Sequence, residues 1–151
     1  MKIIYIAGYG RSGSTLLESL LQYQPSIHAC GEMFYFFRFY GTKTLHCSCG
    51  EVLEKCDFWS GVAQELHKKG FSAEKFQYYA KKQKKREAHW NRGGSFFPER
   101  YQTCYEGFMQ PFLDAVFNLH DHQSILVDSS KTAPVALHRP IAISKLYGYQ
   151  V

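Results

Sequence analysis

Hydrophobic residues along the chain fall into blocks whose spacing alternates between that of strands and that of helices. Residues 2–7 are a run of β-branched and aromatic side chains that ends at Gly8, a pattern typical of a buried strand. Four leucines then share one face at helical spacing, namely Leu16, Leu17, Leu20 and Leu21. Pro25 ends that helix. The opening therefore predicts a strand, a glycine-rich turn and a helix.

The rest of the chain continues this alternation. Helices are predicted over residues 57–70, 72–91 and about 99–120, and Pro111 should kink or split the last of them. The helix of residues 57–70 has one apolar side, made of Trp59, Val62, Ala63 and Leu66. A second buried strand is predicted over residues 124–127, ending at Asp128.

Strands that alternate with helices predict an α/β fold with a parallel sheet. Residues 26–30 can add a short further strand. Ligands of such sheets bind at the carboxyl ends of the strands. Residues 8–15 and 128–131 both follow predicted strands, so both are expected at that edge.

The composition predicts one folded domain with an uneven charge. The chain has 151 residues, 45% of them hydrophobic and 17% aromatic, with a net charge of +5. Residues 68–92 contain nine lysines and arginines against two glutamates, so this segment is basic and the remainder is slightly acidic. A basic segment can attract nucleic acid or anionic lipid, but a solvated helix face is the favoured interpretation.

The termini and cysteines bear on the compartment. No apolar run is long enough to cross a bilayer, and the first apolar stretch is too short for a signal peptide, so a cytoplasmic location is expected. Five cysteines without a secretion signal favour free thiols.

The segment most informative about chemistry is residues 8–15, which fit the pattern G-x-x-x-x-G-[ST]-T. Backbone N–H groups in such a loop, together with a helix N-terminus, form an anion site. Ser14 stands where a Walker loop has its lysine, which counts against an ATPase or kinase. Arg11 supplies a cation inside the loop instead. The alternative, a plain glycine-rich turn, explains the flanking strand and helix less well.

This loop resembles the 5′-phosphosulfate loop of sulfotransferases that use 3′-phosphoadenosine 5′-phosphosulfate (PAPS). Three later segments resemble bacterial and tyrosylprotein-type members of that family in the same order. They are Cys30-Gly31-Glu32; Cys47-Ser48-Cys49-Gly50-Glu51 with Cys56-Asp57-Phe58-Trp59; and Val127-Asp128-Ser129-Ser130-Lys131-Thr132-Ala133-Pro134. The resemblance implies a P-loop-like three-layer fold and transfer of a sulfuryl group from PAPS to an acceptor hydroxyl or amine.

The resemblance also implies roles for individual residues. The 5′-phosphosulfate would be bound by Arg11, Ser12, Gly13, Ser14 and Thr15. Arg11 would in addition stabilise charge on the oxygen that leaves sulfur. Glu32 matches the general base, and Lys131 matches a lysine that touches the sulfonate. PAPS would be a co-substrate, and sulfuryl transfer in this family needs no metal.

Each of these roles has a plainer alternative. Glu32 can be an ordinary surface glutamate or helix cap, and Lys131 a surface lysine. His28 is a competing base, although a single histidine is more often structural. Ser129 and Ser130 can bind phosphate or simply shape a turn. Asp128 can also be a Mg²⁺ ligand of a nucleotide kinase, which the missing Walker lysine disfavours.

The cysteines of the middle segment allow a zinc site. Cys47, Cys49 and Cys56 are candidate ligands, with His46 as a fourth. Their spacing lacks paired C-x-x-C units, so the pattern is weak evidence for zinc. A disulfide or free thiols packed beside Trp59 are favoured.

One expected part of the family pattern is not found in the sequence. Family members hold the 3′-phosphate with an arginine on a later strand and a serine some eight residues further on. This pattern is not found here, because the only arginine after Lys131 is Arg139, which Pro140 follows. The chain is therefore expected to be a partial sulfotransferase domain over residues 1–151. An incomplete sheet would expose an edge through which chains associate.

Other functions stay open beside the sulfotransferase. A non-catalytic phosphate or nucleotide binder would use the same loop without turnover. An RNA- or lipid-binding module would use residues 68–92, although nucleic acid is not the expected partner. The acceptor, whether a small molecule, carbohydrate or peptide, is not identified by the sequence.

Overall fold

A computed structural model describes residues 2–47, 49–91, 99–120 and 125–130, together with Pro140 and Ser144. The chain forms two compact units. The first contains residues 1–33 and 120–151, and the second contains residues 34–119. No helix among the described residues is both long and apolar enough to cross a membrane.

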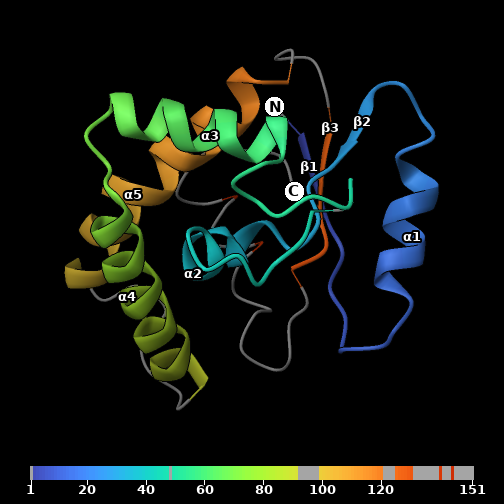
Figure 1. The fold of residues 1–151 in the computed structure, drawn as a ribbon. Helices are drawn as coiled ribbons and strands as arrows, with labels where there is room; N and C mark the ends of the chain where they lie inside the picture. The colour runs from blue at the N-terminus through green and yellow to red at the C-terminus, as the bar shows by residue number, and fades with distance from the viewer. Residues whose placement is uncertain are drawn as a thin grey trace. The chain divides into compact units, whose positions relative to one another are not determined.

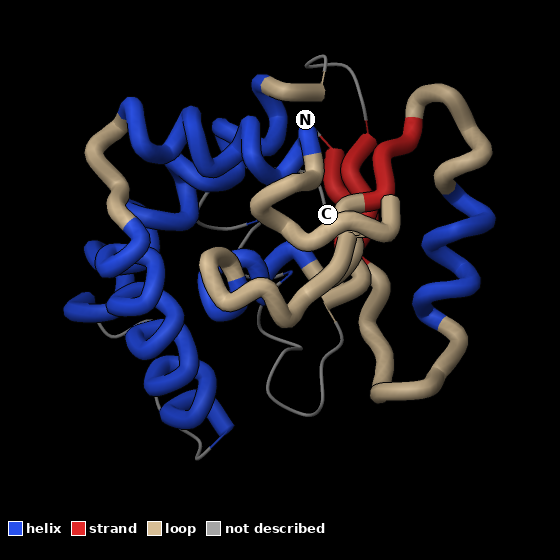
Figure 2. Tube along the Cα trace, in the orientation of Figure 1, coloured by secondary structure: helices blue, strands red, loops and turns tan. Residues whose placement is uncertain are grey.

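The first unit is built on a small parallel sheet, which confirms the α/β class. Its strands are β1 (Lys2–Tyr5), β2 (Ile27–Ala29) and β3 (Ile125–Asp128), and they lie side by side in the order β1-β3-β2 (Figures 1 and 2). Tyr5 is in register with Asp128, and Ala29 with Val127, so the carboxyl ends of all three strands reach the same edge. The three predicted strands are thus present. β1 and β2 are shorter than predicted, and β3 includes Asp128. β1 is not the buried strand that the sequence predicts, since only Ile3 of its residues is buried.

Helix α1 (Ser14–Leu21) follows β1 as predicted, but its leucines do not face a core. Leu16, Leu17 and Leu20 are 67%, 47% and 58% exposed, whereas Ser14 and Glu18 are buried. The face that is buried is therefore the polar one. Tertiary hydrogen bonds of Glu18 override the helical apolar pattern here.

The second unit is helical. It contains α2 (Phe36–Phe39), α3 (Asp57–Lys68), α4 (Ala73–Asn91) and α5 (Glu99–Asn118), and the turn η1 (Met33–Tyr35) leads into it. Trp59, Val62, Ala63 and Leu66 of α3 are all buried, as the sequence predicts. The core is aromatic: the Phe112 ring lies 4.4 Å from Phe37 and 5.5 Å from Phe36 between centroids.

The ends and interior of two helices show how the sequence shapes this unit. The N–H of Lys75 donates to the Ser72 hydroxyl at 3.4 Å, so Ser72 caps α4. Helix α5 is not split at Pro111. Proline leaves the carbonyl of Gly107 without its helical N–H donor, but Gly107 is exposed and water can bond to that carbonyl. Buried neighbours such as Phe108 and Phe112 hold the helix on both sides.

Candidate functional site

The loop between β1 and α1 has the backbone of an anion site. Arg11 has a φ of 63° and Gly13 a φ of 80°, so two of its residues are left-handed. This conformation is uncommon for an arginine and often marks a functional turn. At Gly8, a side chain would come within 2.7 Å of the Ser12 hydroxyl, so glycine suits the close turn there.

The start of α1 is open to a negatively charged ligand. Gly13 occupies the N-cap and no side chain caps the helix, and the first turn contains no acidic residue. Arg11, Ser12 and Thr15 are exposed, whereas Ser14 is buried. Among the described residues, the Ser14 hydroxyl has no hydrogen-bond partner. The helix N-terminus, its dipole and this hydroxyl together favour an oxyanion.

Glu18, which the sequence analysis missed, connects this loop to the other two strands. It lies one turn after Ser14 on the buried face of α1 and is 6% exposed. Its Oε1 accepts a hydrogen bond from the Gly31 N–H and its Oε2 one from the Ser129 hydroxyl, both at 2.5 Å. One carboxylate thus binds the segment after β2 and the segment after β3. The only sequence clue is that Glu18 is a charged residue within the leucine-rich helix.

Backbone hydrogen bonds complete the connection between these segments. The Ser129 N–H donates to the Gly31 carbonyl at 2.9 Å, and the Cys30 N–H donates to the Val127 carbonyl at 2.9 Å. The Tyr5 hydroxyl donates to the Ser130 carbonyl at 2.6 Å. The carboxyl ends of β1, β2 and β3 are therefore fixed to one another.

Asp128 and the two serines after it are buried and shape the end of β3. The Ser130 N–H donates to Asp128 Oδ1 at 2.8 Å, which is a turn made by an aspartate side chain. Ser129 is engaged with Glu18. These contacts support the turn-forming interpretation of both serines.

The candidate catalytic residues are placed only in part. Glu32 is half-buried and follows Gly31 directly, so it lies at the same sheet edge as the loop. Arg11 lies in the loop itself. Lys131 lies outside the described residues, as do Thr132 and Pro134.

His28 has a structural environment instead. It lies within β2, and its ring stacks on His120 with 3.3 Å between centroids. Burial, followed by the nearby His120, lowers the pKa of His28 from 6.5 to about 4. Burial also lowers the pKa of His120. The pair is therefore neutral at pH 7 and half-buried, which supports a structural role for His28.

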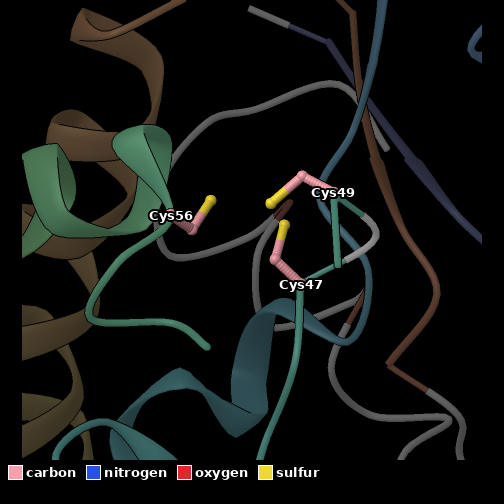
Figure 3. A group of neighbouring side chains, drawn as sticks. All are labelled: Cys47, Cys49 and Cys56. Carbon is pink, nitrogen blue, oxygen red and sulfur yellow. The ribbon is translucent and has the colours of Figure 1, made fainter. Parts of the chain in front are cut away.

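The three cysteines of the second unit come together although their spacing is unusual. The sulfur atoms of Cys47, Cys49 and Cys56 lie within 4.8 Å of one another (Figure 3). His46, the fourth ligand suggested by the sequence, is exposed and its Nδ1 lies 3.0 Å from the Gly50 carbonyl oxygen. Cys30, Cys47, Cys49 and Cys56 are thiols that form no disulfide within the described residues.

Comparison with protein-family models, with curated proteins and with solved structures finds no match to this chain.

Replacing Glu18 tests whether its carboxylate fixes the sheet edge. Glu18→Gln places an amide N–H₂ group among the two donors, and we expect the free energy of unfolding to fall by about 2 kcal/mol, the scale of a hydrogen bond to a charged group. Urea unfolding measures this, with the exposed Glu51→Gln as the matched control. Equal stability of both variants would contradict the role given to Glu18.

The histidine pair predicts a loss of stability in acid. The folded-state pKa of His28 lies below its unfolded value of 6.5, so its neutral form stabilises the fold above pH 6.5. That contribution is lost as the pH falls from 6.5 toward 4. Urea midpoints measured across this range should fall more steeply for the native chain than for His28→Gln. Parallel curves for the two proteins would show that His28 does not couple folding to protonation.

Proposed function

We propose that this chain is a sulfotransferase domain that takes a sulfuryl group from PAPS and moves it to an acceptor hydroxyl or amine. The observation that carries the proposal is the convergence of three segments on one sheet edge. The loop of residues 8–15, the segment of residues 30–32 and the segment of residues 128–130 are the ones that resemble the family. These segments follow β1, β2 and β3. The Glu18 carboxylate joins the last two of them by accepting hydrogen bonds from Gly31 and Ser129.

The loop has the chemistry that a phosphosulfate requires. Two left-handed residues and an uncapped helix start offer backbone N–H groups to an oxyanion. A bound oxyanion would also satisfy the buried Ser14 hydroxyl, which otherwise carries the cost of an unmade hydrogen bond. The guanidinium of Arg11 can hold two oxygens of the ligand at once.

The reaction proposed at this edge is an in-line displacement at sulfur. The acceptor oxygen or nitrogen bonds to sulfur while the bond from sulfur to the 5′-phosphate oxygen breaks, which releases adenosine 3′,5′-bisphosphate. Glu32 takes the acceptor proton, and Arg11 stabilises the charge that develops on the departing phosphate oxygen. These roles come from the resemblance, and the neighbouring sheet edge supports them.

A second candidate is a phosphate or nucleotide binder that does not turn over. It is favoured by the geometry of the loop, because the left-handed Arg11 and Gly13 and the uncapped start of α1 are sufficient to hold an oxyanion without any catalytic base. Binding of the donor through the loop alone would then be indifferent to the 3′-phosphate.

Replacing Arg11 tests the donor site. We expect Arg11→Ala to weaken binding of adenosine 5′-phosphosulfate by about 10- to 100-fold, because it removes a charge-assisted hydrogen bond of about 1.5–3 kcal/mol. Calorimetric titration measures the affinity, and Arg38→Ala, an exposed arginine of α2, is the matched control. An unchanged affinity in Arg11→Ala would exclude the loop as the site.

Two further measurements distinguish a sulfotransferase from a non-catalytic phosphate or nucleotide binder. Adenosine 3′,5′-bisphosphate titrated in parallel shows whether the 3′-phosphate contributes to affinity. PAPS consumption with a panel of hydroxyl and amine acceptors shows turnover, which Glu32→Gln should reduce by at least about 100-fold without loss of donor binding. Binding with no turnover on any acceptor would favour the non-catalytic candidate.

A further inference from the structure

The loop between α2 and α3 brings three thiols to one point. The described residues on either side of the turn form a small hairpin, in which His46 and Val52 are bridged and the Cys47 N–H donates to the Glu51 carbonyl at 2.8 Å. The Gly50 N–H donates to the Cys47 carbonyl at 2.9 Å. This tight turn holds Cys47 and Cys49 on the same side of the loop (Figure 3).

The third thiol comes from the helix start. Cys56 is the N-cap residue of α3 and is 5% exposed. Its N–H donates to the Val52 carbonyl at 3.0 Å, so its position follows that of the hairpin. The Trp59 N–H bonds to its sulfur, which fixes the thiol at the start of α3.

The distances suit a metal ion better than a disulfide. Tetrahedral Zn²⁺ with sulfur at about 2.3 Å needs sulfur atoms about 3.8 Å apart, and the three sulfurs already lie within 4.8 Å of one another. A disulfide would use only two of them. Within the described part of the chain, these are the only three or more ligand atoms of His, Cys, Asp or Glu close enough to hold one ion.

The ligands of such a site are thiols, which hold a divalent ion only as thiolates. Binding of the ion therefore displaces their protons.

We propose that Cys47, Cys49 and Cys56 bind one Zn²⁺ ion as three thiolate ligands, with the fourth position taken by solvent or another exogenous ligand. Thiolates select soft or borderline metals, and zinc accepts three protein ligands with one open position. The open position lies on the exposed side, where Cys49 is. The ion connects the hairpin to the start of α3. This site is independent of the loop of residues 8–15 and of the proposed sulfuryl transfer.

The test uses the full chain, reduced and freed of metal, titrated with Co²⁺ and then with Zn²⁺ in competition. We expect one equivalent of Co²⁺ to give the intense visible bands of tetrahedral thiolate coordination, and one equivalent of Zn²⁺ to remove them with release of protons. Cys56→Ser and Cys49→Ser should each weaken Zn²⁺ binding by more than about 100-fold, beyond the effect of losing an outer-shell partner.

The controls keep the result interpretable. Cys30→Ala removes a buried thiol of the other unit and should bind Zn²⁺ like the native chain. Cys49 is exposed, so Cys49→Ser tests the ligand without disturbing the packing if Cys56→Ser fails to fold. His46→Ala should keep the bands, because His46 is not one of the ligands.

Three results would overturn the proposal. The first is an octahedral Co²⁺ spectrum or no binding in the native chain. The second is retention of full Zn²⁺ affinity by Cys49→Ser. The third is a disulfide among the three cysteines that persists in reductant and prevents binding.

Discussion

The buried carboxylate of Glu18 is the interaction on which the sheet unit depends. A buried carboxylate is costly unless hydrogen-bond donors surround it, and here the donors are Gly31 after β2 and Ser129 after β3. Glu18 itself lies on α1, the helix that follows the loop of residues 8–15. The cost of burial is therefore offset only when all three strand ends are in their native positions. Gly31 and Ser129 lie 13 and 111 residues from Glu18 in the sequence. This one side chain therefore fixes the relative positions of segments that are far apart along the chain.

The same carboxylate explains where sequence reasoning succeeded and where it failed. Periodicity predicts α3 and β3 because each buries its own apolar pattern. It predicts β1 as a strand but not its burial, since only Ile3 is buried and Ile4 is exposed. It also fails for the orientation of α1, where three of the four leucines are exposed and the polar face is buried. Local pattern cannot reveal that Glu18 has partners distant in the sequence. The continuity of α5 through Pro111 is a similar case, because buried neighbours decide it.

The candidate site also combines features that the sequence predicts with features that only the structure reveals. The glycine pattern of residues 8–15 predicts the loop, whereas the left-handed conformations of Arg11 and Gly13 are found only in the structure. Glu32 and Arg11 were identified by resemblance, and the strands bring their segments to one edge. The role of Ser129 as a ligand of Glu18 was not predictable from the sequence, since a serine after a strand has many possible partners. The cysteine spacing is only weak evidence for a metal site, because it lacks paired C-x-x-C units. In the structure, the hairpin turn nevertheless brings the three sulfur atoms close together.

Binding of a phosphosulfate donor at the sheet edge that Glu18 assembles can be tested by amide hydrogen exchange of the full chain, with and without adenosine 3′,5′-bisphosphate. We expect the ligand to slow exchange in residues 8–17 and, through Glu18, at Gly31 and Ser129. Exchange in the core of α3 should be unchanged. Protection confined to the basic helix α4, or no protection anywhere in the first unit, would contradict it.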